Sequence, residues 1–115
     1  MANAKASAKQ IGIPPRKVRL VADQIRGKRV AAARAILQFT EKSCAVVLTK
    51  VLESAVANAA TAAAEKRELI DTDTMVVTRI EIGEGMKLKR FQPSCRGRAL
   101  PIRKRSSHIY LEIGG

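Results

Sequence analysis

The chain has 115 residues, with 22 Lys and Arg against 10 Asp and Glu, so its formal net charge is +12. This length predicts a single domain, residues 1–115, with one modest core, and 46% apolar residues argue against global disorder. The sequence has no apolar run of 18 or more residues and no hydrophobic signal core at its start. We therefore expect neither a membrane span nor a secretory signal.

The positive charge is concentrated in two parts of the chain. Residues 1–40 carry nine basic residues and one acidic residue, and residues 85–115 carry eight basic residues and one acidic residue. Residues 41–84 carry five basic and eight acidic residues. General solubility does not require such segregation, which indicates particular surfaces that face a polyanion, with nucleic acid as the first candidate.

The N-terminal segment alternates small residues, Ala2 to Ala8 at every second position, with polar residues that include Lys5 and Lys9. A period of two is typical of a strand with a small-residue inner face and a basic outer face. A disordered terminus is the alternative.

Three helices are predicted next. Residues 12–28 form the first, with Pro14 and Pro15 in its first turn and Gly27 at its C-terminal cap. Residues 29–39 form a shorter second helix across a tight corner. Residues 43–68 form the longest, with Thr40 or Ser43 as its cap. The expected inward residues are Val18, Val21, Ala22, Ile25, Val30, Ala33, Ile36, Leu37, Cys44, Leu48, Val51, Leu52, Ala55, Val56 and Ala59.

Two β-rich runs complete the pattern. Residues 74–82 alternate, with Val76, Thr78, Ile80 and Ile82 expected on one face. Residues 106–113 alternate again, with Ile109, Leu111 and Ile113 inward and His108, Tyr110 and Glu112 outward. The predicted fold is α+β, with three helices packed on a small three-stranded antiparallel sheet and a long β-hairpin arm.

The arm, residues 83–106, contains the basic stretch "RFQPSCRGRALPIRKR" from Arg90 to Arg105. Strand connections usually take two to six residues, so an insertion of this length requires a reason. Two extended arms would reach on the order of 30 Å from the domain, with Gly97 supplying the turn. A polyanion that neutralises the arm would order it, whereas the alternative is a flexible loop with no specific contact.

Candidate chemistry other than binding is sparse. We predict that Cys44 and Cys95 are free thiols, with Cys44 in the core. The sequence contains no metal-ligand spacing and no cofactor motif. His108 is the only histidine, it lies on an exposed strand face, and no nucleophile motif accompanies it. We expect a protein that is not an enzyme, with Asp71, Asp73, Glu81 and Glu84 forming a solvated rim.

The runs "KVRLVADQIRGK", "VLESAVANA" and "KRFQPSCRGRALPIRKRSSHI" closely resemble the bacterial-type large-subunit ribosomal protein L-twenty-two family, in order and spacing over nearly the whole chain. The resemblance implies a small α+β domain near the exit of the nascent-peptide tunnel. It also implies an extended hairpin that lines the tunnel wall beside the protein L-four. The implied partners are large-subunit rRNA, neighbouring large-subunit proteins and the nascent peptide, in the cytoplasm. We expect neither a membrane partner nor a homo-oligomer.

The resemblance also implies functional positions. The tip of the hairpin corresponds to Lys89, Arg90, Arg96, Gly97 and Arg98. The candidate RNA-binding residues are Lys5, Lys9, Arg16, Lys17, Arg19, Arg26, Lys28, Arg29, Lys87, Lys89, Arg90, Arg96, Arg98, Arg103, Lys104, Arg105, Ser106 and His108. The sequence departs from commoner members at Leu88, Phe91, Cys95, Leu100 and Pro101, where it carries more apolar bulk.

A helix–turn–helix DNA-binding protein is the alternative from another class, suggested by the corner at Gly27 and the basic first helix. Its second helix, "VAAARAIL", offers few side chains that read base edges.

Overall fold

A computed structural model of the chain describes residues 3–67, 71–85, 88–93 and 99–114. In chain order the elements are β1 (Asn3–Ile11), α1 (Pro15–Ile25), α2 (Val30–Gln38), α3 (Cys44–Glu65), a 3₁₀ turn η1 (Thr72–Thr74), β2 (Val76–Glu84), β3 (Leu88–Pro93), β4 (Ala99–Lys104) and β5 (Ser107–Gly114).

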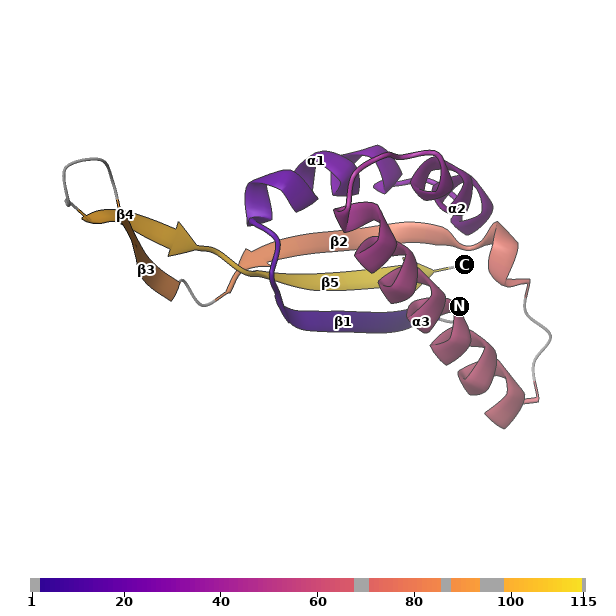
Figure 1. Ribbon diagram of the computed structural model, residues 1–115. Helices are drawn as coiled ribbons and strands as arrows, with labels where there is room; N and C mark the ends of the chain where they lie inside the picture. Colours follow the sequence, from indigo (N-terminus) through magenta and orange to yellow (C-terminus); the bar gives the residue numbers. More distant parts are fainter. Residues whose placement is uncertain (1–2, 68–70, 86–87, 94–98, 115) are drawn as a thin grey trace.

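The sheet has the strand order β1-β5-β2, and both pairs are antiparallel. The three helices cover one of its faces, and the opposite face is left open (Figure 1). The predicted α+β class is confirmed, as is the N-terminal strand, in which Ala4 and Ala6 are buried against the helices. The C-terminal strand β5 is central, and Ile109, Leu111 and Ile113 lie in the core as expected.

The first helix is shorter than predicted, since it runs from Pro15 to Ile25 within the predicted residues 12–28, but its end signals lie where the sequence predicts. Pro15 occupies its first position, which costs no hydrogen bond because that N–H has no partner within a helix. Gly27, one residue beyond the cap, has φ +77°, a left-handed conformation that glycine adopts without steric cost. The expected inward face, Val18, Val21, Ala22 and Ile25, is fully buried.

The long helix α3 packs across the sheet, and all seven of its predicted core residues are buried. The predicted cap is confirmed in position at Ser43 but not in its hydrogen bond. Ser43 stands at the N-cap position with a helical backbone and makes no side-chain cap hydrogen bond. The Thr40 hydroxyl donates instead to the carbonyl of Ile36, at 2.6 Å, and so belongs to the end of α2. By length and composition alone α3 is long and apolar enough to cross a membrane, a property that core helices of soluble proteins share.

The predicted inner face of β2 is wrong at its beginning. Met75 and Val77 are buried, whereas Val76 is half-buried and Thr78 is exposed. The reason is a register shift between Val77 and Arg79, where β2 contains one residue more than β5. Such a bulge reverses the alternation, so that Ile80 and Ile82 return to the core as predicted.

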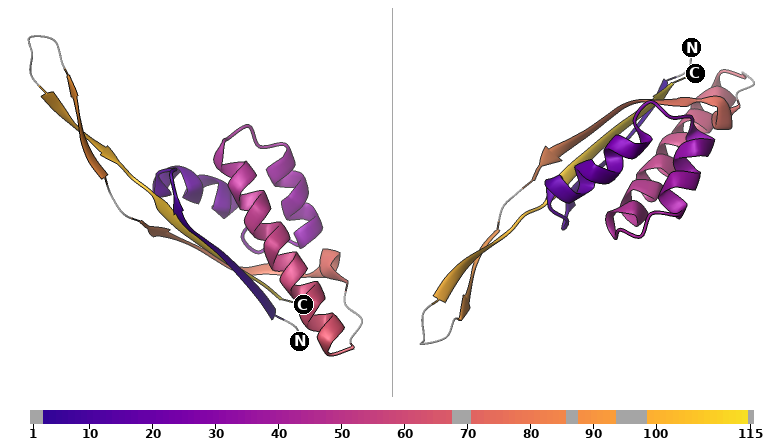
Figure 2. Two further views of the ribbon diagram at one scale, coloured as in Figure 1. Left: turned by 60° about the horizontal axis from the view of Figure 1, so that its bottom comes forward. Right: turned by 90° about the horizontal axis from the view of Figure 1, so that it is seen from above.

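The hairpin arm continues outward from β2 and β5 as a second ribbon, β3 paired antiparallel with β4 (Figure 2). Its ladder runs from Leu88 opposite Lys104 to Pro93 opposite Ala99. The molecule measures 67 × 26 × 16 Å, and its radius of gyration is 17.5 Å. A compact domain of this length would have a radius of gyration of roughly 13 Å, and the larger observed value reflects the extended arm.

Candidate nucleic-acid interface

The arm carries basic residues at both of its strands. The β3–β4 register places Lys89 opposite Arg103, and Lys104 stands opposite Leu88. Like charges directly opposite each other destabilise a strand pair, so this ribbon gains stability when an anion neutralises them. The predicted tip residues Arg96, Gly97 and Arg98, together with Lys87 and Cys95, lie outside the described residues.

The root of the arm is fastened to the end of β1. The backbone N–H of Gln10 donates to Nδ1 of His108 at 3.1 Å, and the Ser106 hydroxyl donates to Oε1 of Gln10 at 3.0 Å. Gln10 has φ +56°, and it lies in the β1 register shift between Ala8 and Ile11. These contacts, which we call the root clamp (Gln10, Ser106 and His108), fix where the arm leaves the sheet.

Two further contacts tighten this junction. Ser107 is fully buried, and its hydroxyl donates to the carbonyl of Ile13 in the β1–α1 connection. The N–H of Gly85 donates to the carbonyl of Ser106 at 2.9 Å. A Cβ on Gly85 would lie 2.3 Å from the Ser106 hydroxyl oxygen and 3.2 Å from the Ser106 carbonyl carbon, so any other residue here would displace that hydroxyl and crowd the backbone.

The basic first helix lies along the free edge of β2. Arg19 donates from Nη2 to the carbonyl of Ile82 at 3.1 Å, and Arg26 donates from Nη2 to the carbonyl of Ile80 at 3.0 Å. Arg26 also pairs with Asp23 one turn earlier. Both guanidinium groups hydrogen-bond to carbonyls at the edge of the sheet, and part of their positive charge stays at the surface.

The direction of α1 decides which predicted residues come together. Its N-terminal end lies beside the part of β2 from which the arm departs (Figure 1). Four exposed residues therefore gather near the arm root although they are distant in sequence, namely Lys9, Arg16, Arg19 and Arg105. The half-buried His108 joins them through the root clamp, which uses its Nδ1 and gives it a structural contact as well.

Other predicted residues lie elsewhere. Lys28 and Arg29 follow α1 and pair with the start of β2, on the order of 20 Å from the arm root along the strand. Lys5 lies on the open face of the sheet, where the register places it beside Glu112. The predicted set thus divides into a root group, an arm group and outlying cations.

The open face of the sheet contains an ordered group that the sequence did not reveal. The Arg79 guanidinium lies 5.7 Å from the centroid of the Tyr110 ring, and it donates two hydrogen bonds to Oε1 of Glu81, at 2.9 and 2.6 Å. The hydrogen bond to Glu81 is the main reason that the pKa of Arg79 is raised. The predicted alternation also places Arg79 and Glu81 on the face opposite Ile80 and Ile82, but only the pairing of β2 with β5 shows that Arg79 lies against Tyr110.

The predicted acidic rim is partly engaged in ion pairs. Arg34 of α2 donates to both carboxylate oxygens of Glu53 in α3, at 2.6 and 3.0 Å, and to Asp73 of η1 at 2.9 Å. The pKa of Arg34 is raised, first by the hydrogen bond to Glu53. This cluster joins three elements on the side of the molecule that carries the acidic middle segment.

Comparison with known proteins agrees with this architecture. Residues 6–114 match the family model described as "Ribosomal protein L22p/L17e". The chain is 53% identical over 113 residues to the large ribosomal subunit protein uL22 of Desulfitobacterium hafniense strain Y51, covering 98% of this chain and 95% of that protein. It is 52% identical over 106 residues to the uL22 protein of Clostridium acetobutylicum, covering 92% and 91%, and 49% identical over 111 residues to that of Pediococcus pentosaceus, covering 96% and 90%.

Proposed function

Because the chain belongs to the ribosomal protein L22p/L17e family, a structural and non-enzymatic family, we propose that it binds and organises large-subunit rRNA. In bacteria this subunit is cytoplasmic, and the chain is a constituent of it. The observation that supports rRNA binding best is the convergence of the basic start of α1, the end of β1 and the basic arm at one end of the sheet.

Binding occurs chiefly through phosphate groups. Lys and Arg side chains at the arm root neutralise phosphates and release condensed counterions, which makes the affinity strongly salt-dependent. Arg side chains add bidentate phosphate contacts and stack on bases. The root clamp fixes the direction of the arm before RNA is bound, and this lowers the conformational entropy that binding costs.

The arm extends the protein into the RNA. From the last pair of the main sheet, Glu84 opposite Ser107, to the last pair of the ribbon, each strand adds about eight or nine residues. At roughly 3.3 Å per residue this spans nearly 30 Å. The globular part lies near the exit of the peptide tunnel, and the arm lines the tunnel wall, where its tip contacts the passing nascent peptide and neighbouring ribosomal proteins.

Sedimentation of the tagged full-length protein tests this proposal. In a sucrose gradient of a cell lysate, the tagged protein should travel with large subunits and whole ribosomes. A free pool with none in large subunits would refute it.

A gel-shift comparison separates this function from recognition of duplex DNA. The exposed face of α2 presents Ala31, Ala32 and Ala35, which cannot hydrogen-bond to base edges. The protein should therefore prefer folded rRNA fragments to duplex DNA, and it should show no preference for one DNA sequence over another.

A further inference from the structure

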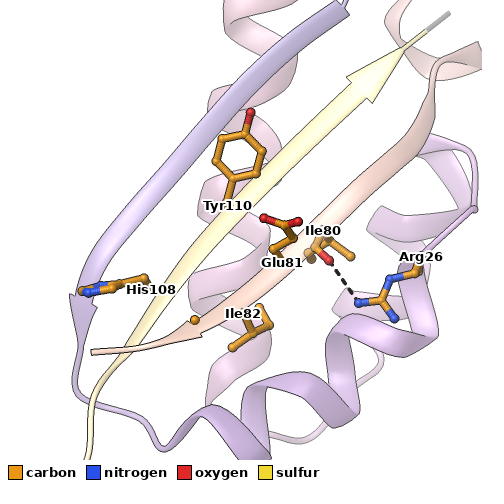
Figure 3. A pocket seen from close by; sticks show the side chains of 7 residues that line it. Arg26, Ile80, Glu81, Ile82, His108 and Tyr110 are labelled. Atoms are coloured by element: carbon orange, nitrogen blue, oxygen red, sulfur yellow. Dashed lines mark hydrogen bonds between the residues drawn. The ribbon is translucent and has the colours of Figure 1, made fainter. Parts of the chain in front are cut away.

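The open face of the sheet is hollowed beside the arm root. The hollow has a volume of about 550 Å³, and its rim includes Arg26, Glu81, His108 and Tyr110. In Figure 3, Tyr110 and His108 project from β5, Glu81 projects from β2, and Arg26 lies beyond the edge of β2. Pockets that take small molecules measure roughly 300–1,000 Å³, so the hollow is large enough for one nucleotide.

The Tyr110 ring forms one side of this hollow (Figure 3). Tyr110 and His108 are two residues apart on β5 and therefore face the same way, about 6.6 Å apart along the strand. Both are half-buried, but only the Tyr110 ring stands over the hollow, because the His108 ring turns toward β1, where its Nδ1 accepts from Gln10 (Figure 3). Arg79 lies against the Tyr110 ring at 5.7 Å and steadies it. Unstacked RNA bases bind on surfaces of this kind, because every base has a flat π-face.

Gly83 keeps the hollow open. The register places it opposite His108, and it contributes no side chain to the space between β5 and the edge of β2. A Cβ at this position would meet the His108 Cβ at 3.8 Å, an ordinary contact. The fold therefore tolerates a side chain here, and such a side chain would fill the hollow without disturbing the core.

Polar groups stand where a nucleotide would need them. Arg79 directs both of its hydrogen bonds to Oε1 of Glu81, so the Oε2 atom of that carboxylate can accept an N–H from the edge of a base. At the opposite margin, Arg26 donates to the carbonyl of Ile80 and pairs with Asp23, and its half-exposed guanidinium can also donate to the adjoining phosphate.

We propose that this hollow holds one unstacked nucleotide of the bound RNA, with its base against Tyr110, a base N–H on Glu81 and its phosphate near Arg26. The inference rests on the proposed function and deepens it, since it assigns the open face of the sheet a role in base recognition. A ring surface combined with a guanidinium cation favours a nucleotide over a protein segment, because the two groups match its base and its phosphate.

Three substitutions and one control test the site in purified large subunits. Tyr110→Ala removes the stacking ring, Tyr110→Phe keeps it, and Gly83→Val fills the hollow. Ser7→Val is the matched control, since Ser7 is exposed on the neighbouring strand β1, opposite Tyr110 but outside the hollow. The readout is chemical probing of the rRNA at single-nucleotide resolution.

In wild-type subunits one nucleotide should be protected by the protein. Tyr110→Ala and Gly83→Val should expose that nucleotide while the remaining protections persist, and Tyr110→Phe and Ser7→Val should match wild type. On an RNA fragment containing that nucleotide, Tyr110→Ala should weaken binding about 5- to 150-fold, the equivalent of roughly 1–3 kcal/mol for one stacked base.

An unchanged reactivity pattern in both Tyr110→Ala and Gly83→Val subunits would overturn the inference and leave the proposed function intact. A photoreactive phenylalanine analogue at position 110 distinguishes the occupant, because an adduct with RNA supports the inference and an adduct with protein alone overturns it. Absence of the wild-type protein from large subunits would instead refute the proposed function, and this inference with it.

Discussion

Replacing Gly85 by alanine should destabilise the protein by crowding the arm root. The new Cβ would lie 2.3 Å from the Ser106 hydroxyl oxygen and 3.2 Å from the Ser106 carbonyl carbon. Overpacking of this kind costs typically about 1–3 kcal/mol, and displacing the Ser106 hydroxyl also weakens its hydrogen bond to Gln10. For a chain of this length, each kcal/mol lowers Tm by about 4 °C, so we expect a decrease of roughly 4–12 °C.

The matched control is Gly83→Ala, two residues earlier on the same strand. Its Cβ would make an ordinary contact at 3.8 Å, and we expect its Tm to lie within about 2 °C of wild type. Ser106→Ala in the Gly85→Ala background removes the closest contact, so the double variant should be more stable than the two single effects predict, with a coupling energy above about 0.5 kcal/mol.

Thermal and urea unfolding followed by circular dichroism at 222 nm measure these changes. Equal stabilities for Gly85→Ala and Gly83→Ala would show that the arm root is not closely packed, and the reasoning would fail. Strict additivity of the Gly85 and Ser106 effects would show that the two residues are not in contact.

The remaining predictions concern other parts of the molecule. Arg34→Met should lower the free energy of unfolding by about 0.5–1 kcal/mol in low salt and by less in 1 M NaCl, because the ion pairs of Arg34 are largely exposed. The raised pKa of Arg34 lies far above neutrality, so the contribution of Arg34 to stability is fully present below its unfolded pKa. The effect of the substitution should therefore not vary between pH 6 and 9 in unfolding titrations. In a Cys95→Ser background, Cys44 should react with a thiol reagent only after unfolding, because it is 2% exposed, and rapid reaction of the native protein would contradict its burial. Lys89→Glu should stabilise the free arm by relieving the repulsion with Arg103, and slower hydrogen exchange would show this. The same substitution should lower the slope of log affinity for RNA against log salt concentration by about 1–2. An unchanged slope would show that Lys89 makes no phosphate contact.

Strong periodic signals predicted most of the fold. The α1 and α3 faces follow a helical repeat without interruption, and β5 alternates up to Ile113, so its buried residues could be assigned directly. The ends of these elements were also marked, with Pro15 at the start of α1 and Gly27 past its end. These features depend on local spacing, which a sequence displays.

Irregular positions were not predictable in the same way. The extra residue at Thr78 changes which side chains of β2 face the core, and no residue type announces a bulge there. Gln10 adopts a left-handed backbone within the β1 register shift, where its N–H donates to His108, and its residue type does not mark such a position. The root clamp likewise joins residues almost one hundred positions apart, and only the folded sheet shows that they meet.

The candidate interface was predicted in its residue types but not in its arrangement. Charge segregation indicated α1 and the arm, yet it could not separate the root group from Lys28 and Arg29, because the direction of α1 along β2 decides that division. The hollow on the open face combines residues of β2 and β5 with Arg26 of α1, and only the outward Tyr110 and His108 pointed to it in the sequence.

A crosslinking map of residues 90–105 within purified large subunits tests the central claim most directly. With photoreactive residues placed along β3 and β4, the account predicts adducts to rRNA along both strands and, toward the tip, to the nascent peptide and to neighbouring ribosomal proteins. Adducts only to proteins on the solvent-facing surface of the subunit, with none to rRNA, would contradict the claim that the arm enters the RNA.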